Sequence, residues 1–282
     1  MAFPYLTDVL HALGVQISVP LPMFGLFVGI AFFTGKWLAG VEARRLMPGS
    51  DPELMSNACL TAFLAGIVGA RLFHVLEYPR EFIADPAAML LSTGGFTIFG
   101  GLIVGALAAA WYARSQRASI VMLLDAAAPG LMLAYAIGRI GCQISGDGDW
   151  GIAVTSPAPA WLPDWLWAQT YDGNIAGVDI PPPGVYPTPL YEVVMSAAAF
   201  ALLWKLRKHS HATGWMFGVY LLLAGIERFA IELIRVNAKY SLFGLEVTQA
   251  QLISGAFIVA GLVLMWRRAA PPLNAPAKDL VH

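Results

Sequence analysis

Seven long apolar runs dominate the sequence and leave few folds open to it. They cover about 19–39, 56–76, 96–113, 120–141, 190–205, 214–235 and 249–267. A helix needs about 20 apolar residues to cross roughly 30 Å of hydrocarbon, and these runs reach or approach that length. The runs predict an all-α fold, namely a polytopic membrane protein with a bundle of seven transmembrane helices.

Charge is correspondingly scarce. Only 12% of the 282 residues are charged and 58% are hydrophobic, whereas a soluble domain typically carries about 25% charged residues. The formal net charge of −1 excludes the basic footprint of a nucleic-acid binder, so we expect membrane lipids and no nucleic acid as partners.

The positions of the basic residues predict an orientation. One set of alternate loops, with the C-terminal tail, holds eleven of the 17 Lys and Arg residues: Lys36, Arg44, Arg45, Arg114, Arg117, Lys205, Arg207, Lys208, Arg267, Arg268 and Lys278. The other loops hold Arg80 and Lys239, and the stretch from 143 to 189 holds none. Cytoplasmic loops are rich in Lys and Arg, so the N-terminus is predicted outside and the C-terminus in the cytoplasm.

The same pattern predicts one integral membrane domain over 1–282. Residues about 2–14 have apolar side chains at helical spacing and no basic leader, which favours a helix lying in the outer interface over a cleaved signal peptide. The long outer loop, about 143–189, carries four Trp residues, which suit the headgroup layer.

Ionisable side chains inside the sixth run are the first functional signal. Arg228, Glu232 and Arg235 follow one another at i, i+4 and i+7, a spacing that places all three on one helix face. Charges within a span are costly and usually functional. We expect a net positive stripe near the outer leaflet that suits a phosphate.

The fourth run supplies a second arginine, Arg139, followed by a glycine-rich turn that includes Ser145 and Gly146. Arginine binds phosphate through a planar, permanently charged fork, and glycines let backbone N–H groups approach an anion. The two segments predict a phosphate cradle. The alternative is that these arginines extend to the interface or pair structurally with acidic groups.

Several further polar residues accompany the cradle. Arg71 and His74 lie at the outer end of the second span, where His74 is either a base or hydrogen-bonded structure. Glu192 opens the fifth span and is expected to pair with an arginine of the cradle. Cys142 is expected to pack, although its neighbours leave a functional role open. Gly101 and Gly105 predict close helix packing, and the glycine pairs flanking 96–99 also allow a re-entrant turn.

Four segments in register resemble the prolipoprotein diacylglyceryl transferases of bacteria. They are Gly-Gly-Leu-Ile at 100–103, Gly-Arg-Ile-Gly at 138–141, Pro-Thr-Pro-Leu-Tyr-Glu at 187–192 and Gly-Ile-Glu-Arg-Phe-Ala-Ile-Glu-Leu-Ile-Arg at 225–235. The resemblance implies an inner-membrane enzyme, with its active site toward the outer face, that uses no metal or other cofactor. Its substrates would be phosphatidylglycerol and the lipobox cysteine of a prolipoprotein, and its products a thioether-linked lipoprotein precursor and glycerol phosphate.

The resemblance also implies residue roles. Arg139, Arg228 and Glu232 match the family's essential arginines and their carboxylate partner. Together with the reading from the residues, this gives a catalytic set of Arg139, Arg228 and Glu232, and a phospholipid-binding set of Arg139, Ser145, Gly146, Arg235 and Arg71. Supporting or acid-base candidates are His74, Asp147, Tyr186, Glu192 and Cys142.

The chain departs from the family at several polar positions. Phe99 and Tyr186 stand where the family has histidines, and further differences are Pro189 for Gln, Cys142 for Asn, Phe24 for an aromatic hydroxyl and Ala224 for Tyr. The departures leave the general base open between His74, Asp147 and Tyr186. They also keep open a related phospholipid-dependent transferase with another acceptor. The arginines within the spans keep open a third function, a transporter of an anionic solute or lipid.

Overall fold

The computed structural model describes residues 1–91, 97–209, 211–237, 239–242 and 245–268. The chain is mostly helical, with 67% of it in helices and little strand, which agrees with the predicted all-α class. Within the described residues, five helices are long and apolar enough to cross a membrane: α2 (Met23–Leu46), α3 (Leu54–Glu77), α7 (Ile120–Ser145), α9 (Thr188–Leu206) and α11 (Gln249–Arg267).

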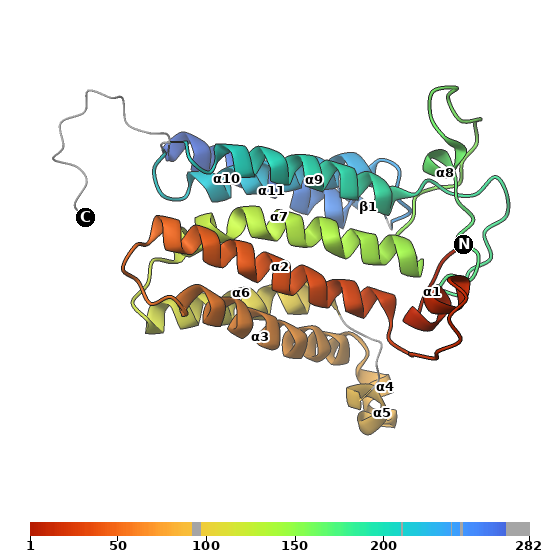
Figure 1. Ribbon diagram of the computed structural model, residues 1–282, viewed down its shortest axis with the longest axis horizontal. Coiled ribbons are helices and arrows are strands. Elements are labelled where there is room, and N and C mark those ends of the chain that lie inside the picture. The colour runs from red at the N-terminus through yellow and green to blue at the C-terminus, as the bar shows by residue number, and fades with distance from the viewer. Residues whose placement is uncertain (92–96, 210, 238, 243–244, 269–282) are drawn as a thin grey trace. The chain divides into compact units, whose positions relative to one another are not determined.

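Two more helices fall on the remaining predicted spans. They are α6 (Ile98–Ser115) and α10 (Trp215–Glu232). Short elements connect the long ones: α1 (Leu6–Ala12), α4 (Pro79–Ala84), α5 (Pro86–Leu91), α8 (Asp164–Trp167), and an antiparallel hairpin of β1 (Lys239–Leu242) and β2 (Leu245–Thr248). Figure 1 shows these elements along the chain.

The chain comprises two compact units, residues 36–127 and residues 1–35 with 128 onward. In the first unit α3 packs on α6. Glycines permit the approach, since a Cβ at Gly105 would lie 2.8 Å from the Ala62 carbonyl oxygen and one at Gly101 would lie 3.3 Å from that of Gly66. The close packing predicted for Gly101 and Gly105 is confirmed. The re-entrant turn predicted around 96–99 is wrong from Ile98 onward, because α6 is a continuous helix from that residue. Residues 92–96 lie outside the described residues.

The second unit contains most of the polar residues singled out above. Its core is formed by α7, α9 and α10 through Ala128, Met132, Leu203, Met216 and Val219, and α11 packs along α10. Figure 1 shows α9, α10 and α11 grouped beside α7. The helices thus bring the two arginine-bearing segments into one unit.

Several helix ends differ from those predicted. The first span starts at Met23 and runs to Leu46 rather than 19–39, and the fourth continues to Ser145, where the Ser145 hydroxyl donates to the Gly141 carbonyl at 2.8 Å. Gly146 then ends this helix with φ of +61°, a value that glycine adopts without a Cβ clash. The N-terminal helix is Leu6–Ala12 rather than 2–14, with the Asp8 carboxylate accepting from the Tyr5 N–H at 2.8 Å.

The segment from 146 to 187 is held as an ordered lobe of the second unit. Tyr171, Ile180 and Val185 form a small core with Trp150, and the Tyr171 hydroxyl donates to Gln143 of α7 at 2.8 Å. Isolated bridges join Ala153 and Gln169 to Val185. These contacts fix the position of the acidic turn that follows α7.

Candidate active site

A buried ion pair joins α7 to α9. Arg139 donates from Nη2 to Oε2 of Glu192, and the Glu192 side chain is 0% exposed. The hydroxyl of Tyr135, one turn before Arg139, donates to the other Glu192 oxygen at 2.8 Å. Both Glu192 oxygens therefore have donors, as a buried carboxylate requires. The predicted pairing of Glu192 with an arginine is present.

Asp149 links Arg139 to a second arginine, Arg235. Arg139 donates to Oδ2 of Asp149 and Arg235 donates to Oδ1. The Thr188 hydroxyl donates to the Asp149 carbonyl oxygen at 2.7 Å, which fixes the backbone from which the carboxylate reaches. Burial opposes the charged form of Asp149, but the two guanidinium groups outweigh it and hold its pKa below the ordinary range.

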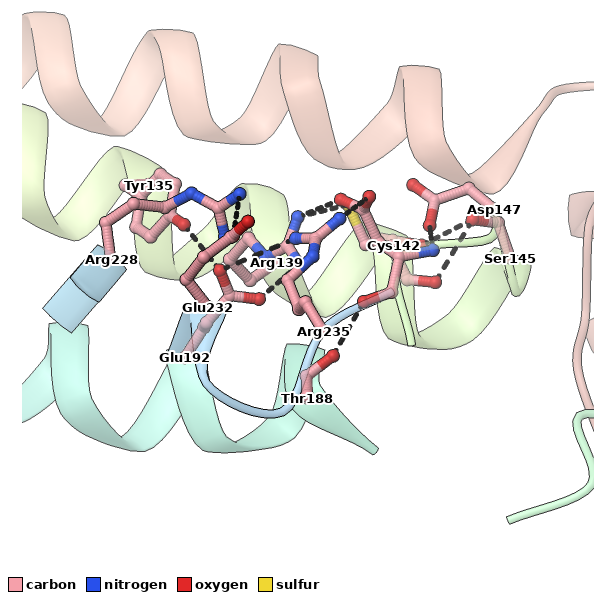
Figure 2. A network of polar contacts seen from close by, with 12 residues as sticks. Tyr135, Arg139, Cys142, Ser145, Asp147, Thr188, Glu192, Arg228, Glu232 and Arg235 are labelled. Carbon is pink, nitrogen blue, oxygen red and sulfur yellow. Dashed lines mark hydrogen bonds and ion pairs between the residues drawn. The ribbon is translucent and has the colours of Figure 1, made fainter. Parts of the chain in front are cut away.

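The third arginine has its own carboxylate. Arg228 Nη2 lies 2.8 Å from Glu232 Oε2, one turn along α10, and the other Glu232 oxygen accepts from the Asn237 side chain at 2.7 Å. Figure 2 shows Arg228 and Glu232 beside Arg139, Arg235 and Glu192, so that the three arginines form one cluster.

Two buried donor atoms of this cluster have no hydrogen-bond partner among the described residues: Arg139 Nε and Arg228 Nη1. Folded proteins rarely leave such atoms unsatisfied, and each exception calls for a partner such as a water molecule, an ion or a bound polar group. The Arg228 side chain is also 30% exposed, against 9% for Arg139. Arg228 is thus the arginine best placed to meet a ligand.

The predicted stripe on one helix face is confirmed for Arg228 and Glu232, which pair at i and i+4, and is wrong for Arg235. The regular helix α10 ends at Glu232, and Leu233 and Ile234 donate to carbonyls three residues back, which tightens the last turn. Arg235 then forms a bridge with Gly151. A Cβ on Gly151 would lie 2.6 Å from the Ile234 carbonyl oxygen, so only glycine permits this approach, and Arg235 is turned toward Asp149 instead of Glu232.

The glycine-rich turn also differs from the predicted cradle. The Ser145 hydroxyl is committed to Gly141, and the Gly146 N–H donates to the Cys142 carbonyl at 3.0 Å. Gly146 is itself packed, since a Cβ there would lie 2.7 Å from that of Asn174. Ser145 and Gly146 thus shape the turn, and in this conformation these donors serve the protein rather than an anion.

Cys142 and Asp147 lie next to the arginine cluster. The Cys142 sulfur accepts from Arg139 at 3.4 Å, and one Asp147 oxygen accepts from the Asp149 N–H at 3.3 Å. Ligand atoms of Cys142, Asp147 and Asp149 lie within 4.8 Å of one another, close enough to hold a metal ion. Arg139 and Arg235 already pair with Asp149, however, and their positive charge opposes a cation at this point.

The other predicted site residues make contacts of their own. Arg71 and His74 belong to the unit of residues 36–127. The Arg71 guanidinium donates to the Met89 carbonyl at 3.0 Å, and the His74 ring lies 4.9 Å from that of Tyr78. Tyr186 is in the same unit as the arginine cluster, with its ring against Trp167 at 5.1 Å.

Some contacts in and near the arginine cluster were not predicted from the sequence. Asp149 was one of several acidic residues in a long loop, and its position opposite two arginines depends on the fold of that loop. Tyr135 lies one helical turn before Arg139, a spacing that could have pointed to it. Glu227 accepts from the Ser196 hydroxyl at 2.6 Å, with both residues buried, and only the packing of α9 on α10 reveals this pair.

Comparison with known proteins identifies the family. The sequence profile of the family described as prolipoprotein diacylglyceryl transferase matches residues 12–267. Proteins named phosphatidylglycerol--prolipoprotein diacylglyceryl transferase are similar over most of their length. That of Symbiobacterium thermophilum is 32% identical over 249 residues, 86% of this chain and 86% of its own. That of Vibrio vulnificus is 30% identical over 270 residues, 94% of this chain and 92% of its own. That of Corynebacterium diphtheriae is 28% identical over 267 residues, 91% of this chain and 92% of its own. Because the match covers nearly the whole chain, this membrane protein belongs to the prolipoprotein diacylglyceryl transferase family.

Proposed function

We propose that this protein transfers the diacylglyceryl group of phosphatidylglycerol to the lipobox cysteine of prolipoproteins. The thiolate sulfur of the acceptor forms a bond to the glyceryl carbon that bears the phosphate. The carbon–oxygen bond breaks, and glycerol phosphate leaves with the electron pair. Displacement of a phosphate by sulfur requires a thiolate and stabilisation of charge on the leaving group.

The unpaired donors of the arginine cluster carry this proposal. Arg228 Nη1 and Arg139 Nε are buried and have no hydrogen-bond partner in the described part of the chain. Guanidinium groups in a site of low dielectric stabilise a phosphate leaving group strongly. In this proposal Arg139 and Arg228 contact the lipid phosphate, Glu232 orients Arg228, and Arg235 assists in binding.

The topology belongs to the same proposal. The basic residues favour an outward N-terminus, a cytoplasmic C-terminus, and seven spans in which α6 and α10 join the five helices named above. The whole chain forms one integral domain of the bacterial inner membrane, with α1 in the outer interface and the active site toward the outer face. Labelling of a single cysteine placed at Trp161, which is 80% exposed in the long loop, by an impermeant reagent on intact cells tests this orientation.

A transfer assay tests the reaction. Purified protein in detergent is incubated with phosphatidylglycerol and a lipobox peptide, and mass spectrometry follows both products. We expect the peptide to gain one diacylglyceryl group for each glycerol phosphate released, and a peptide with Ser in place of the lipobox Cys to remain unmodified. Absence of both products from folded, lipid-bound protein would contradict the proposal.

A second function is favoured by two aromatic residues. Phe99 and Tyr186 stand where the resemblance leads us to expect histidines, so a transferase with the same donor and a different acceptor is the alternative. Release of glycerol phosphate without modification of the lipobox peptide would favour it. Phe99→His and Tyr186→His variants then test whether peptide transfer is gained.

A further inference from the structure

The carboxylate of Asp149 occupies a position between two guanidinium groups that come from distant parts of the chain. Arg139 lies within α7, and Arg235 follows the end of α10; each donates to a different Asp149 oxygen. A phosphodiester presents two oxygens to arginines in much the same way. Asp149 therefore has the geometry of an anion bound between two arginines.

Asp149 differs from the other acidic partner of these arginines in its freedom to leave. Glu192 is on α9 with a side chain that is 0% exposed, whereas the Asp149 side chain is 34% exposed and belongs to a loop. The Asp149 backbone is held by the Thr188 hydroxyl at 2.7 Å. The Asp149 carboxylate is thus the more accessible of the two acidic partners, and it projects from an anchored backbone.

The charges of the ion-paired side chains in the cluster balance. Arg139, Arg228 and Arg235 face three carboxylates, those of Asp149, Glu192 and Glu232. Adding a phosphodiester to this set would introduce an uncompensated negative charge into a site of low dielectric, which is unfavourable. Exchange of one monovalent anion for another leaves the total charge of the cluster unchanged.

Resting on the proposed function, we infer that Asp149 is a built-in competitor of the lipid phosphate. Its carboxylate pairs with Arg139 and Arg235 in the free protein and gives way when the phosphodiester of phosphatidylglycerol binds. Its return displaces the glycerol phosphate product. Asp149 thus sets the affinity for the donor lipid and keeps two arginines from holding the product too tightly.

Removal of the competing charge should strengthen lipid binding. A ligand's apparent affinity is reduced by the fraction of protein that is competent to bind. If the carboxylate is seated about nine-tenths of the time, Asp149→Asn should bind short-chain phosphatidylglycerol about tenfold more tightly. Product inhibition by glycerol phosphate should strengthen in the same direction.

The experiment measures binding apart from transfer. Dioctanoyl phosphatidylglycerol is titrated calorimetrically into detergent-solubilised wild type, Asp149→Asn and a control, Asp179→Asn, whose residue is exposed on the same loop. The control should bind as the wild type does. Thermal unfolding verifies that each variant is folded, and Asp149→Ser provides a second neutral variant if the first does not fold.

The outcomes separate this inference from the proposed function. Tighter binding by either neutral variant supports the competitor role. If the wild type carries out transfer and the neutral variants bind the lipid no more tightly than it does, the competitor role is overturned. Asp149 is then a structural partner of the arginines. A wild type that neither binds the lipid nor transfers it overturns both.

Discussion

Arg139 of α7 and Glu192 of α9 form a buried ion pair, and Glu192 has no exposed side-chain surface. The pair has two consequences. It holds Arg139 in one orientation beside the other arginines. It also makes the fold depend on the charge of Arg139, because Glu192 would otherwise keep only the Tyr135 hydroxyl and Arg235 at 3.9 Å, and a poorly compensated buried carboxylate is costly.

Arg139→Ala should therefore lose stability as well as turnover. Removing one partner of a buried pair costs about 3–5 kcal/mol, and we expect transfer to fall at least about 10²–10³-fold if Arg139 contacts the leaving group. The double variant Arg139→Ala/Glu192→Gln removes the stranded charge. It should recover much of the lost melting temperature in detergent while turnover remains low. Recovery of both properties together would show that Arg139 acts only on the fold.

Arg228→Lys tests the arginine that offers an unpaired donor. Lysine keeps the charge near Glu232 and loses the planar fork, so donation by the Nη1 atom disappears. We expect kcat to fall about 10²–10³-fold with a small change in melting temperature, since the Arg228 side chain is 30% exposed. Initial rates at varied phosphatidylglycerol give kcat and KM separately. A change confined to KM would instead assign Arg228 to ground-state lipid binding.

The buried pair of Ser196 and Glu227 gives a prediction on stability alone. Ser196→Ala removes the donor of the 2.6 Å hydrogen bond to Glu227 and should destabilise the protein by about 1–3 kcal/mol. Glu227→Gln keeps an acceptor for the Ser196 hydroxyl and removes a buried charge, so the loss should be smaller. A double-mutant cycle of Ser196→Ala with Glu227→Ala, each of which removes the hydrogen bond, is measured by unfolding in detergent to check the coupling, and additive effects of the two changes would contradict it.

The apolar runs were sufficient to predict the helices, because the length of a span and its hydropathy are local properties of the sequence. The apolar runs were not sufficient to predict where the helices end, as α10 illustrates. Its apolar character continues past Glu232, yet the helix ends there because the Ile234 carbonyl accepts from the N–H of Ile152 at 2.8 Å. The two residues of this contact are 82 positions apart in the chain, so a local sequence pattern cannot predict it.

The residues of the candidate site also fall into two groups, those that the local sequence identifies and those that depend on the fold. Arg139, Arg228 and Glu232 were identifiable because charge is rare in apolar helices. Asp149 lies in a loop, where acidic residues are ordinary, and its role depends on the bridge between Gly151 and Arg235. The pattern could predict that the arginines gather near one another, but the fold decides which carboxylate is paired with them.

Helix packing in the second unit can be tested with paired glycines. A Cβ at Gly225 of α10 would lie 2.8 Å from Ile258 Cγ1 and 2.9 Å from the Ser254 carbonyl oxygen of α11, whereas one at Gly255 would have no atom within 4 Å. Gly225→Ala should cost about 1–3 kcal/mol through overpacking. Gly255→Ala should stabilise the helix by about 0.5–1 kcal/mol. Thermal unfolding compares them, and equal effects would contradict the tight contact.

Asp147 gives a dependence of stability on pH. Burial raises the pKa of Asp147 above its ordinary range and the Asp149 charge adds to this, against a lowering by the Cys142 hydrogen bond. The pKa of Asp147 is higher in the folded protein than in the unfolded chain, so protonation of Asp147 stabilises the fold. This stabilisation is complete below the unfolded pKa and is lost as the pH rises through the folded pKa. Asp147→Asn should therefore raise the melting temperature at about pH 7 and change it little at about pH 4. Asn keeps an acceptor for the Asp149 N–H, and Asp179→Asn serves as the exposed control. A melting temperature lowered at neutral pH would show that the Asp147 charge is favourable in the fold.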